Sequence, residues 1–110
     1  MARDVYSLRI FATGALTSSA GVVGPIVPAG LVYVLRDVDL FETTGAAGTF
    51  AQILSPVAGV LALFAGQAEP TTRSYPWRGR QVYAVGERVG FEVVSGTWSI
   101  TASGYQLTLP

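Results

Sequence analysis

Apolar and polar residues alternate through the C-terminal third of the chain, residues 77–109. Alternation with a period of two is typical of strands that bury one face, and short glycine-containing turns join such strands into an antiparallel meander. The phase of the alternation changes at Ser103 and Gly104, which predicts a β-bulge that keeps the apolar side chains facing inward. The strands predicted here cover residues 81–85, 87–94 and 97–108.

The pattern in the rest of the chain predicts five more strands and two polar loops. Because Pro25 and Pro28 cannot donate to a ladder, the strand that contains them is at best an edge strand. About eight short strands separated by glycine and proline favour a single all-β domain over residues 1–110, an eight-stranded antiparallel sandwich of the jelly-roll type. The five strands cover residues 5–12, 22–28, 31–41, 49–54 and 57–65, and the loops cover 13–21 and 67–76.

Residues 57–65 form the most apolar stretch of the chain, and its periodicity fits a buried strand or a buried helix. The flanking Pro56, Gly59 and Gly66 favour a strand. Because the stretch has neither alternation nor charge, we expect it to be buried on both faces and to contact another subunit. The predicted subunit interface comprises Val60, Leu61, Leu63 and Phe64.

Arg36 is predicted to belong to the same interface. It has the parity of Val34 and Val38 in the strand 31–41, so we expect its side chain to point toward the packed side. A buried arginine needs a carboxylate or carbonyl partner.

The composition indicates where the chain places its apolar surface. Half of the 110 residues are hydrophobic and only 13% are charged, and the mean hydropathy is +0.45. This is more apolar than a small monomer should be, which predicts a homo-oligomer or docking onto a larger assembly. The apolar run within 57–65 is too short for a transmembrane helix. The N-terminal residues do not have the pattern of a signal peptide, and a formal net charge of zero gives no general attraction to nucleic acid or to a membrane surface.

The residue types that most often perform chemistry are missing. The chain has no histidine and no cysteine, so we expect no enzyme activity, no cofactor and no metal site. Asp37 and Asp39 lie two apart on one strand and therefore point the same way, about 7 Å apart. A solvated strand face, with an aspartate paired to Arg36 or to an arginine of a neighbouring subunit, explains them better than a carboxylate pair for catalysis or for a hard cation.

Two other groups of residues have a weak functional interpretation. Tyr75, Trp77, Arg78 and Arg80 would suit stacking on a sugar or a base, but Trp77 as a structural anchor of the sandwich edge is the better interpretation. Ser18 and Ser19 have no predicted base to activate a nucleophile.

Five short motifs occur in order along the chain and span residues 27–109, leaving the first strand outside. The motifs are Val27-Pro28-Ala29-Gly30, Val34-Leu35-Arg36-Asp37-Val38, Trp77-Arg78-Gly79-Arg80, Val85-Gly86-Glu87 and Ser103-Gly104-Tyr105-Gln106-Leu107. This ordered set resembles small structural proteins of tailed bacteriophage virions. The resemblance implies a sandwich of the jelly-roll or tumour-necrosis-factor-like type, often trimeric, that serves as a capsid decoration protein or a minor tail protein and has no catalytic residues.

From the pattern, the composition and the resemblance together, we expect a non-enzymatic structural protein of a bacteriophage virion, namely a trimeric capsid decoration protein. Its predicted partners are copies of itself, as a trimer, and the major capsid or tail proteins of the virion. It would be made in the host cytoplasm and incorporated into the virion. A minor tail or tail-tip protein and a carbohydrate- or receptor-binding module of the virion are the alternatives.

Overall fold

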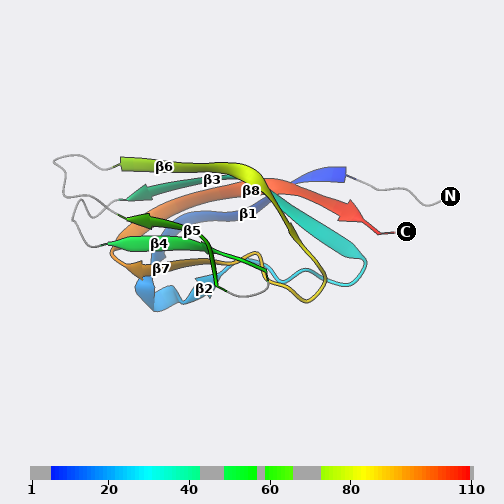
Figure 1. Ribbon diagram of the computed structural model, residues 1–110, viewed down its shortest axis with the longest axis horizontal. Coiled ribbons are helices and arrows are strands. Elements are labelled where there is room, and N and C mark those ends of the chain that lie inside the picture. Colours follow the sequence, from blue (N-terminus) through cyan, green and yellow to red (C-terminus); the bar gives the residue numbers. More distant parts are fainter. Residues whose placement is uncertain (1–5, 43–48, 57–58, 66–72, 110) are drawn as a thin grey trace.

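The computed structural model describes residues 6–42, 49–56, 59–65 and 73–109, and contains eight strands and one short 3-10 helix (Figure 1). The strands form two antiparallel four-stranded sheets. Sheet A has the order β1-β8-β3-β6, and sheet B has the order β2-β7-β4-β5. The elements are β1 (Tyr6–Thr17), η1 (Ser18–Ala20), β2 (Val22–Val23), β3 (Leu31–Glu42), β4 (Phe50–Leu54), β5 (Val60–Ala65), β6 (Arg73–Tyr83), β7 (Phe91–Ser95) and β8 (Thr97–Thr108).

The strand pairing is that of a jelly roll, which confirms the predicted fold class. The first strand pairs with the eighth, the second with the seventh, the third with the sixth and the fourth with the fifth, as in one long hairpin. Pairing of β3 with β8 and of β4 with β7 rolls this hairpin into two sheets. Every connection except that between β4 and β5 therefore crosses from one sheet to the other.

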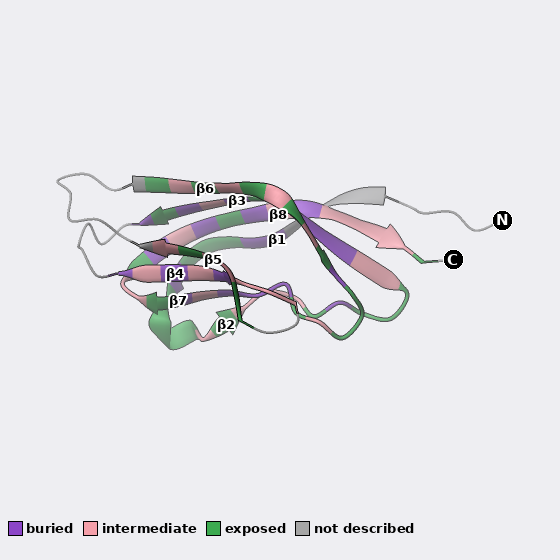
Figure 2. Ribbon diagram, viewed as in Figure 1, coloured by how far each residue is buried: buried purple, intermediate pink, exposed green. Residues whose placement is uncertain are grey.

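The core lies between the two sheets and is built mostly from alternate residues of the long strands (Figure 2). In β8, the buried residues Trp98, Ile100, Ala102 and Gly104 alternate with more exposed ones. Trp98 has no exposed surface and donates its indole N–H to the main-chain oxygen of Ser95 at 3.1 Å, so the polar atom of this large side chain is satisfied inside the core.

The predicted C-terminal meander is wrong. The segments 81–85, 87–94 and 97–108 do contain strand residues, and the last matches β8 at both ends. However, β6 and β8 lie in sheet A on either side of β3, whereas β7 lies in sheet B. A short polar turn looks the same in sequence whether it reverses a hairpin or carries the chain across the sandwich, so alternation alone could not separate the two.

The predicted loops are shorter than expected. β1 continues to Thr17, so most of the predicted loop 13–21 is strand. β6 begins at Arg73 and takes in the end of the predicted loop 67–76, whose residues 67–72 lie outside the described part of the chain. The segment with Pro25 and Pro28 contributes the two-residue edge strand β2 and one isolated bridge, between Ile26 and Arg88, as predicted.

Residues 60–65 form a strand, β5, which resolves the choice between strand and helix. The predicted residues 57 and 58 lie outside the described part of the chain. Burial on both faces is not found within this chain: Leu61, Ala62 and Phe64 pack against the core, whereas Val60 and Leu63 are 49% and 58% exposed. A strand at the edge of a sandwich has one face on the core and one on the outside.

Register shifts occur at one level across sheet A. β1 has an extra residue at Phe11 and β3 has one at Arg36, both opposite the residues 102–104 of β8. A bulge was therefore predicted at the right level, but the extra residues belong to the two neighbouring strands and β8 itself is regular. Gly104 allows this arrangement, because a Cβ atom there would overlap the main-chain oxygen of Val34 and stand 3.0 Å from the ring of Phe11.

Candidate functional site

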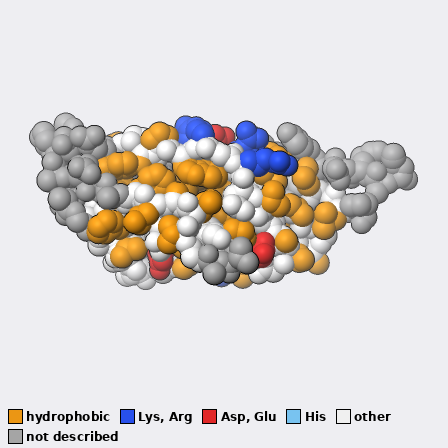
Figure 3. Space-filling view, viewed as in Figure 1, with side chains coloured by type: hydrophobic (Ala, Val, Ile, Leu, Met, Phe, Trp, Pro, Cys, Tyr) orange, Lys and Arg blue, Asp and Glu red, His pale blue; other side chains and the backbone are white. Residues whose placement is uncertain are grey.

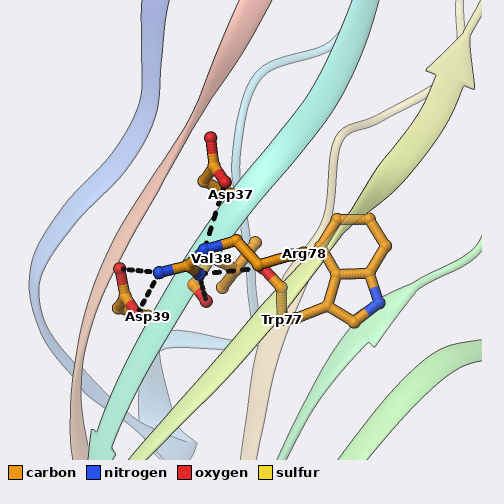
Figure 4. Close-up of polar contacts among 5 residues, drawn as sticks. All are labelled: Asp37, Val38, Asp39, Trp77 and Arg78. Atoms are coloured by element: carbon orange, nitrogen blue, oxygen red, sulfur yellow. Dashed lines mark hydrogen bonds and ion pairs between the residues drawn. The ribbon is translucent and has the colours of Figure 1, made fainter.

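The outer face of sheet A carries a charged cluster centred on Arg78 of β6 (Figure 4). Its Nε lies 3.2 Å from Oδ1 of Asp37, and its Nη2 lies 3.2 Å from Oδ1 of Asp39. Nη1 donates to the main-chain oxygens of Val38, at 3.2 Å, and Trp77, at 3.1 Å. One guanidinium group thus joins two carboxylates of β3 to the edge strand β6, using the fork of donors that arginine provides.

This cluster explains the two aspartates. Asp37 and Asp39 do share one face of β3, as predicted, but their partner is Arg78 and not Arg36. Within the described ranges, no group of three or more acidic residues is placed to hold a metal ion. The side chains of Arg78 and Asp37 are about half exposed, at 55% and 52%, so the cluster lies in contact with solvent.

The expectation that Arg36 points toward the packed side is wrong. Its side chain is exposed, because Arg36 is the extra residue of β3 in its pairing with β8. The bulge shifts the alternation by one residue: Tyr33 and Leu35 face the core before it, and Val38 and Leu40 face the core after it. Counting parity through an unrecognised bulge therefore gives the wrong face for the residue inside it.

The four residues of the predicted ligand platform do not share a surface. Tyr75 and Trp77 are half-buried and pack against the core, whereas Arg78 and Arg80 are exposed. Figure 4 shows the indole ring of Trp77 directed away from the two aspartates that Arg78 binds. The indole lies over Gly79, where a Cβ atom would approach it to 2.7 Å. Trp77 is therefore an anchor of the sandwich edge, and the Trp-x-Gly spacing leaves room for its ring.

The serine pair has no catalytic arrangement. Ser18 and Ser19 belong to η1, and the hydroxyl of Ser19 lies 2.9 Å from that of Thr17. No histidine exists in the sequence to act as a base. The contact is a local one between neighbouring hydroxyls at the end of β1.

A second surface, on sheet B, is apolar. We define the sheet B surface by four exposed side chains of β2, β5 and β7, namely Val22, Val60, Leu63 and Val94. Its polar groups include Gln52 and Glu92, and the amide of Gln52 donates to the carboxylate of Glu92 at 2.7 Å. Register places Gln52 between Glu92 and Leu63, so the polar pair and the apolar residues lie on one face. In Figure 3, hydrophobic side chains spread over the visible face, and arginines gather at its upper rim.

The predicted interface residues are divided between this surface and the core. Val60 and Leu63 belong to the sheet B surface, whereas Leu61 and Phe64 pack against the core. The ring centroid of Phe64 lies 6.3 Å from that of Tyr75, so the edges β5 and β6 meet at this side of the sandwich. Arg36 lies on sheet A, away from the other four. Val22 and Val94 belong to segments far from β5 in sequence, so only the fold brings them to this face.

Comparisons with known proteins find no matching family model and no matching curated protein. Two solved structures with similar chains are both of infectious bursal disease virus. One is the structure of its Gx strain, with 12% identity over 98% of this chain and 32% of that chain, at a TM-score of 0.37. The other is its VP2 subviral particle, with 13% identity over 97% of this chain and 33% of that chain, at a TM-score of 0.37. The chain thus spans about a third of the length of those chains.

The described residues contain no helix of the length and hydropathy that a membrane span requires. They also enclose no detectable ligand pocket. The candidate site is the sheet B surface together with the edge strand β5, to which Val60 and Leu63 belong.

Proposed function

We propose that this chain is a non-enzymatic structural protein of a tailed-bacteriophage virion, and within the virion a capsid decoration protein that acts as a homotrimer. The observation that carries the proposal is the sheet B surface. Two of its four exposed apolar side chains, Val60 and Leu63, belong to β5, an edge strand without charge. Exposed apolar residues gathered on one face and continuous with an open sheet edge are typical of a protein interface.

The sequence indicates to which kind of assembly the chain belongs. The ordered motifs between residues 27 and 109 resemble virion proteins, and the jelly roll is a common fold of viral shells. The trimer is the oligomeric state that the resemblance implies. A threefold arrangement would bury apolar surface of each subunit against its neighbours.

The chemistry of the surface supports a structural role over an enzymatic one. Asp37 and Asp39, the two residues considered for acid–base chemistry, are held by Arg78. The carbohydrate-binding alternative loses its basis, because Tyr75 and Trp77 face the core and not the arginines. The tail remains the alternative location in the virion, and gene order tests it. A position beside the major capsid gene supports decoration, and a position after the tape-measure gene supports the tail.

Sedimentation of the purified chain, alone and with shells of the major capsid protein from the same genome, tests the proposal. We expect a trimer at micromolar concentration that co-sediments with the shells. Leu63→Asp changes an exposed residue, so it should leave the fold intact and weaken self-association. Val85→Asp is the matched control, because Val85 is 54% exposed and lies outside the sheet B surface. Phe64→Asp is less informative, since Phe64 packs against the core.

Binding to neither shells nor tails would overturn the virion role. A wild-type chain that binds shells as a monomer would overturn the trimer alone. Equal effects of Leu63→Asp and Val85→Asp on association would show that the sheet B surface is not the interface.

A further inference from the structure

Each sheet of the sandwich has two edge strands, and these four edges differ in how well they are protected against pairing with another chain. The edges are β1 and β6 in sheet A, and β2 and β5 in sheet B. An edge strand offers unpaired main-chain N–H and C=O groups, and soluble proteins block such groups with prolines, charges, bulges or short strands.

Two of the edges are protected. β2 is only two residues long and is followed by Pro25. β6 contains Pro76, a register shift between Arg78 and Gln81, and the exposed arginines Arg78 and Arg80. Neither strand can offer a regular, uncharged ladder to a partner.

β5 is open. Its residues 60–65 include no charge, proline or glycine, and its one irregularity lies at its start, opposite Ile53 and Leu54. The main-chain N–H of Leu54 donates to the oxygen of Gly90, on the β7 side of β4, at 2.9 Å. Because main-chain groups alternate in direction along a strand, those of Ile53 face β5. Ala62 is the register partner of Ile53, so the main-chain groups of Ala62 point back toward β4. The main-chain N–H and C=O of the next residue, Leu63, therefore point to the open edge.

The second half of β1 is also open. Residues 12–17 contain no charge and no proline, and Thr13, Gly14 and Ala15 are exposed. Gly14 has a positive φ of 107°, yet pairing with β8 continues through it without a shift. The outer edge of this segment thus presents main-chain groups without a neighbouring charge or proline.

The two open edges lie on opposite sides of the sandwich. β5 lies beside β6, because the rings of Phe64 and Tyr75 are in contact. β6 and β1 are the two outermost strands of sheet A, so the strand order places β1 on the far side from β5. A contact between the β5 edge of one copy and the β1 edge of another is therefore heterologous, and such contacts close into rings when the rotation between copies allows it.

We infer that copies of this chain join head to tail by strand addition, with the β5 edge of one subunit pairing with residues 12–17 of β1 in the next. This inference rests on the proposed self-association and specifies its geometry. The occupant of each open edge is a second copy, because each chain carries two open edges, one on each side. Main-chain hydrogen bonds hold the pair, and Leu63 lies at the junction with its side chain on the sheet B surface.

The decisive variant is Leu63→Pro, which removes a main-chain donor at the open edge and keeps an apolar side chain. We expect the dissociation constant of the oligomer to rise at least tenfold, as expected for losing a main-chain hydrogen bond with its partner left unsatisfied. Leu63→Val is the matched control and should associate like the wild type. If Leu63→Pro does not fold, Ala65→Pro repeats the test. Ala65 lies at the end of the strand, and its main-chain N–H points to the same open edge as that of Leu63.

The complementary variant is Ala15→Lys, which places a charge on the exposed part of β1. Alone, Leu63→Pro and Ala15→Lys should each sediment as monomers. Mixed in equal amounts, they retain one intact β5 edge and one intact β1 edge between them, so we expect a heterodimer that grows no further. Ala15→Ser controls for the change of side chain.

Three outcomes overturn the inference. If Leu63→Pro associates like the wild type while Leu63→Asp does not, the subunits meet by their faces and not by their edges. If Ala15→Lys keeps the wild-type oligomer, β5 pairs with something other than β1. If the mixture contains no heterodimer, the contact is not head to tail. Each outcome leaves shell binding by the wild type, and hence the virion role, to be judged separately.

Discussion

The hydroxyl of Tyr83 donates a hydrogen bond of 2.8 Å to the main-chain oxygen of Leu54. Tyr83 ends β6 in sheet A and Leu54 ends β4 in sheet B, so this bond joins the two sheets. Tyr83 is fully buried, and this burial raises the pKa of its hydroxyl. The contact therefore contributes both to cohesion of the sandwich and to its dependence on pH.

Removing this hydroxyl should destabilise the fold. In Tyr83→Phe, the ring still fills its place in the core, but the main-chain oxygen of Leu54 loses its donor inside the protein. We expect the free energy of unfolding to fall by about 1–2 kcal/mol, as is typical when a buried acceptor is left unsatisfied. Urea denaturation at pH 7 measures the difference. An unchanged midpoint would show that water replaces the bond without cost.

The same residue should make stability fall at high pH. Burial, with a smaller contribution from the charge of Glu87, raises the pKa of Tyr83 from 10.0 to about 12. Below pH 10, both states are protonated and the contribution to stability is fully present. Between pH 10 and 12, the unfolded state loses its proton while the folded state keeps it, so the free energy of unfolding falls, by at most about 3 kcal/mol.

Urea denaturation of the wild type and Tyr83→Phe at several pH values from 9 to 12 tests this expectation. The variant should lose less stability across the window, since it lacks the phenol with the raised pKa. Parallel loss in the two proteins would mean that another group controls the alkaline transition.

Gly104 should tolerate no side chain. A Cβ atom there would overlap the main-chain oxygen of Val34 in the neighbouring strand. Since main chain cannot move aside as a side-chain end can, we expect Gly104→Ala to cost more than about 2 kcal/mol or to prevent folding. Thermal unfolding measures this cost. Gly86→Ala is the control: that glycine has a φ of 85° but open space around it, so about 1 kcal/mol is expected.

The Arg78 cluster should contribute modestly to stability. Its side chains are about half exposed, so solvent screens the two ion pairs with Asp37 and Asp39. We expect Arg78→Met to cost about 1 kcal/mol, chiefly from the donors lost at the main-chain oxygens of Val38 and Trp77. Asp37→Asn should cost less, because it removes one screened ion pair and leaves these bonds in place.

Thermal unfolding in low and high salt separates the two contributions, since salt weakens only the ion pairs. A larger loss in Asp37→Asn than in Arg78→Met would contradict this order.

Local pattern predicted the elements of this protein well. The last strand was placed at residues 97–108 because a period-two alternation depends only on the strand itself. The edge position of the segment with Pro25 and Pro28 followed from a missing donor, which is also a local property. The absence of histidine and cysteine, a property of composition alone, limited the chemistry that the chain can perform.

The sequence by itself thus determined a sandwich of about eight strands, its turns and its lack of common catalytic groups. Only the tertiary structure decided which strands are neighbours, because hydrogen bonds between strands join residues such as Asp37 and Arg78, about forty positions apart. It also decided the face on which Arg36 lies, since the pairing of two strands defines which of them holds the extra residue of a bulge. The open edges of β1 and β5 also depend on the tertiary structure, because only the order of strands in each sheet shows which strands have a neighbour on one side alone.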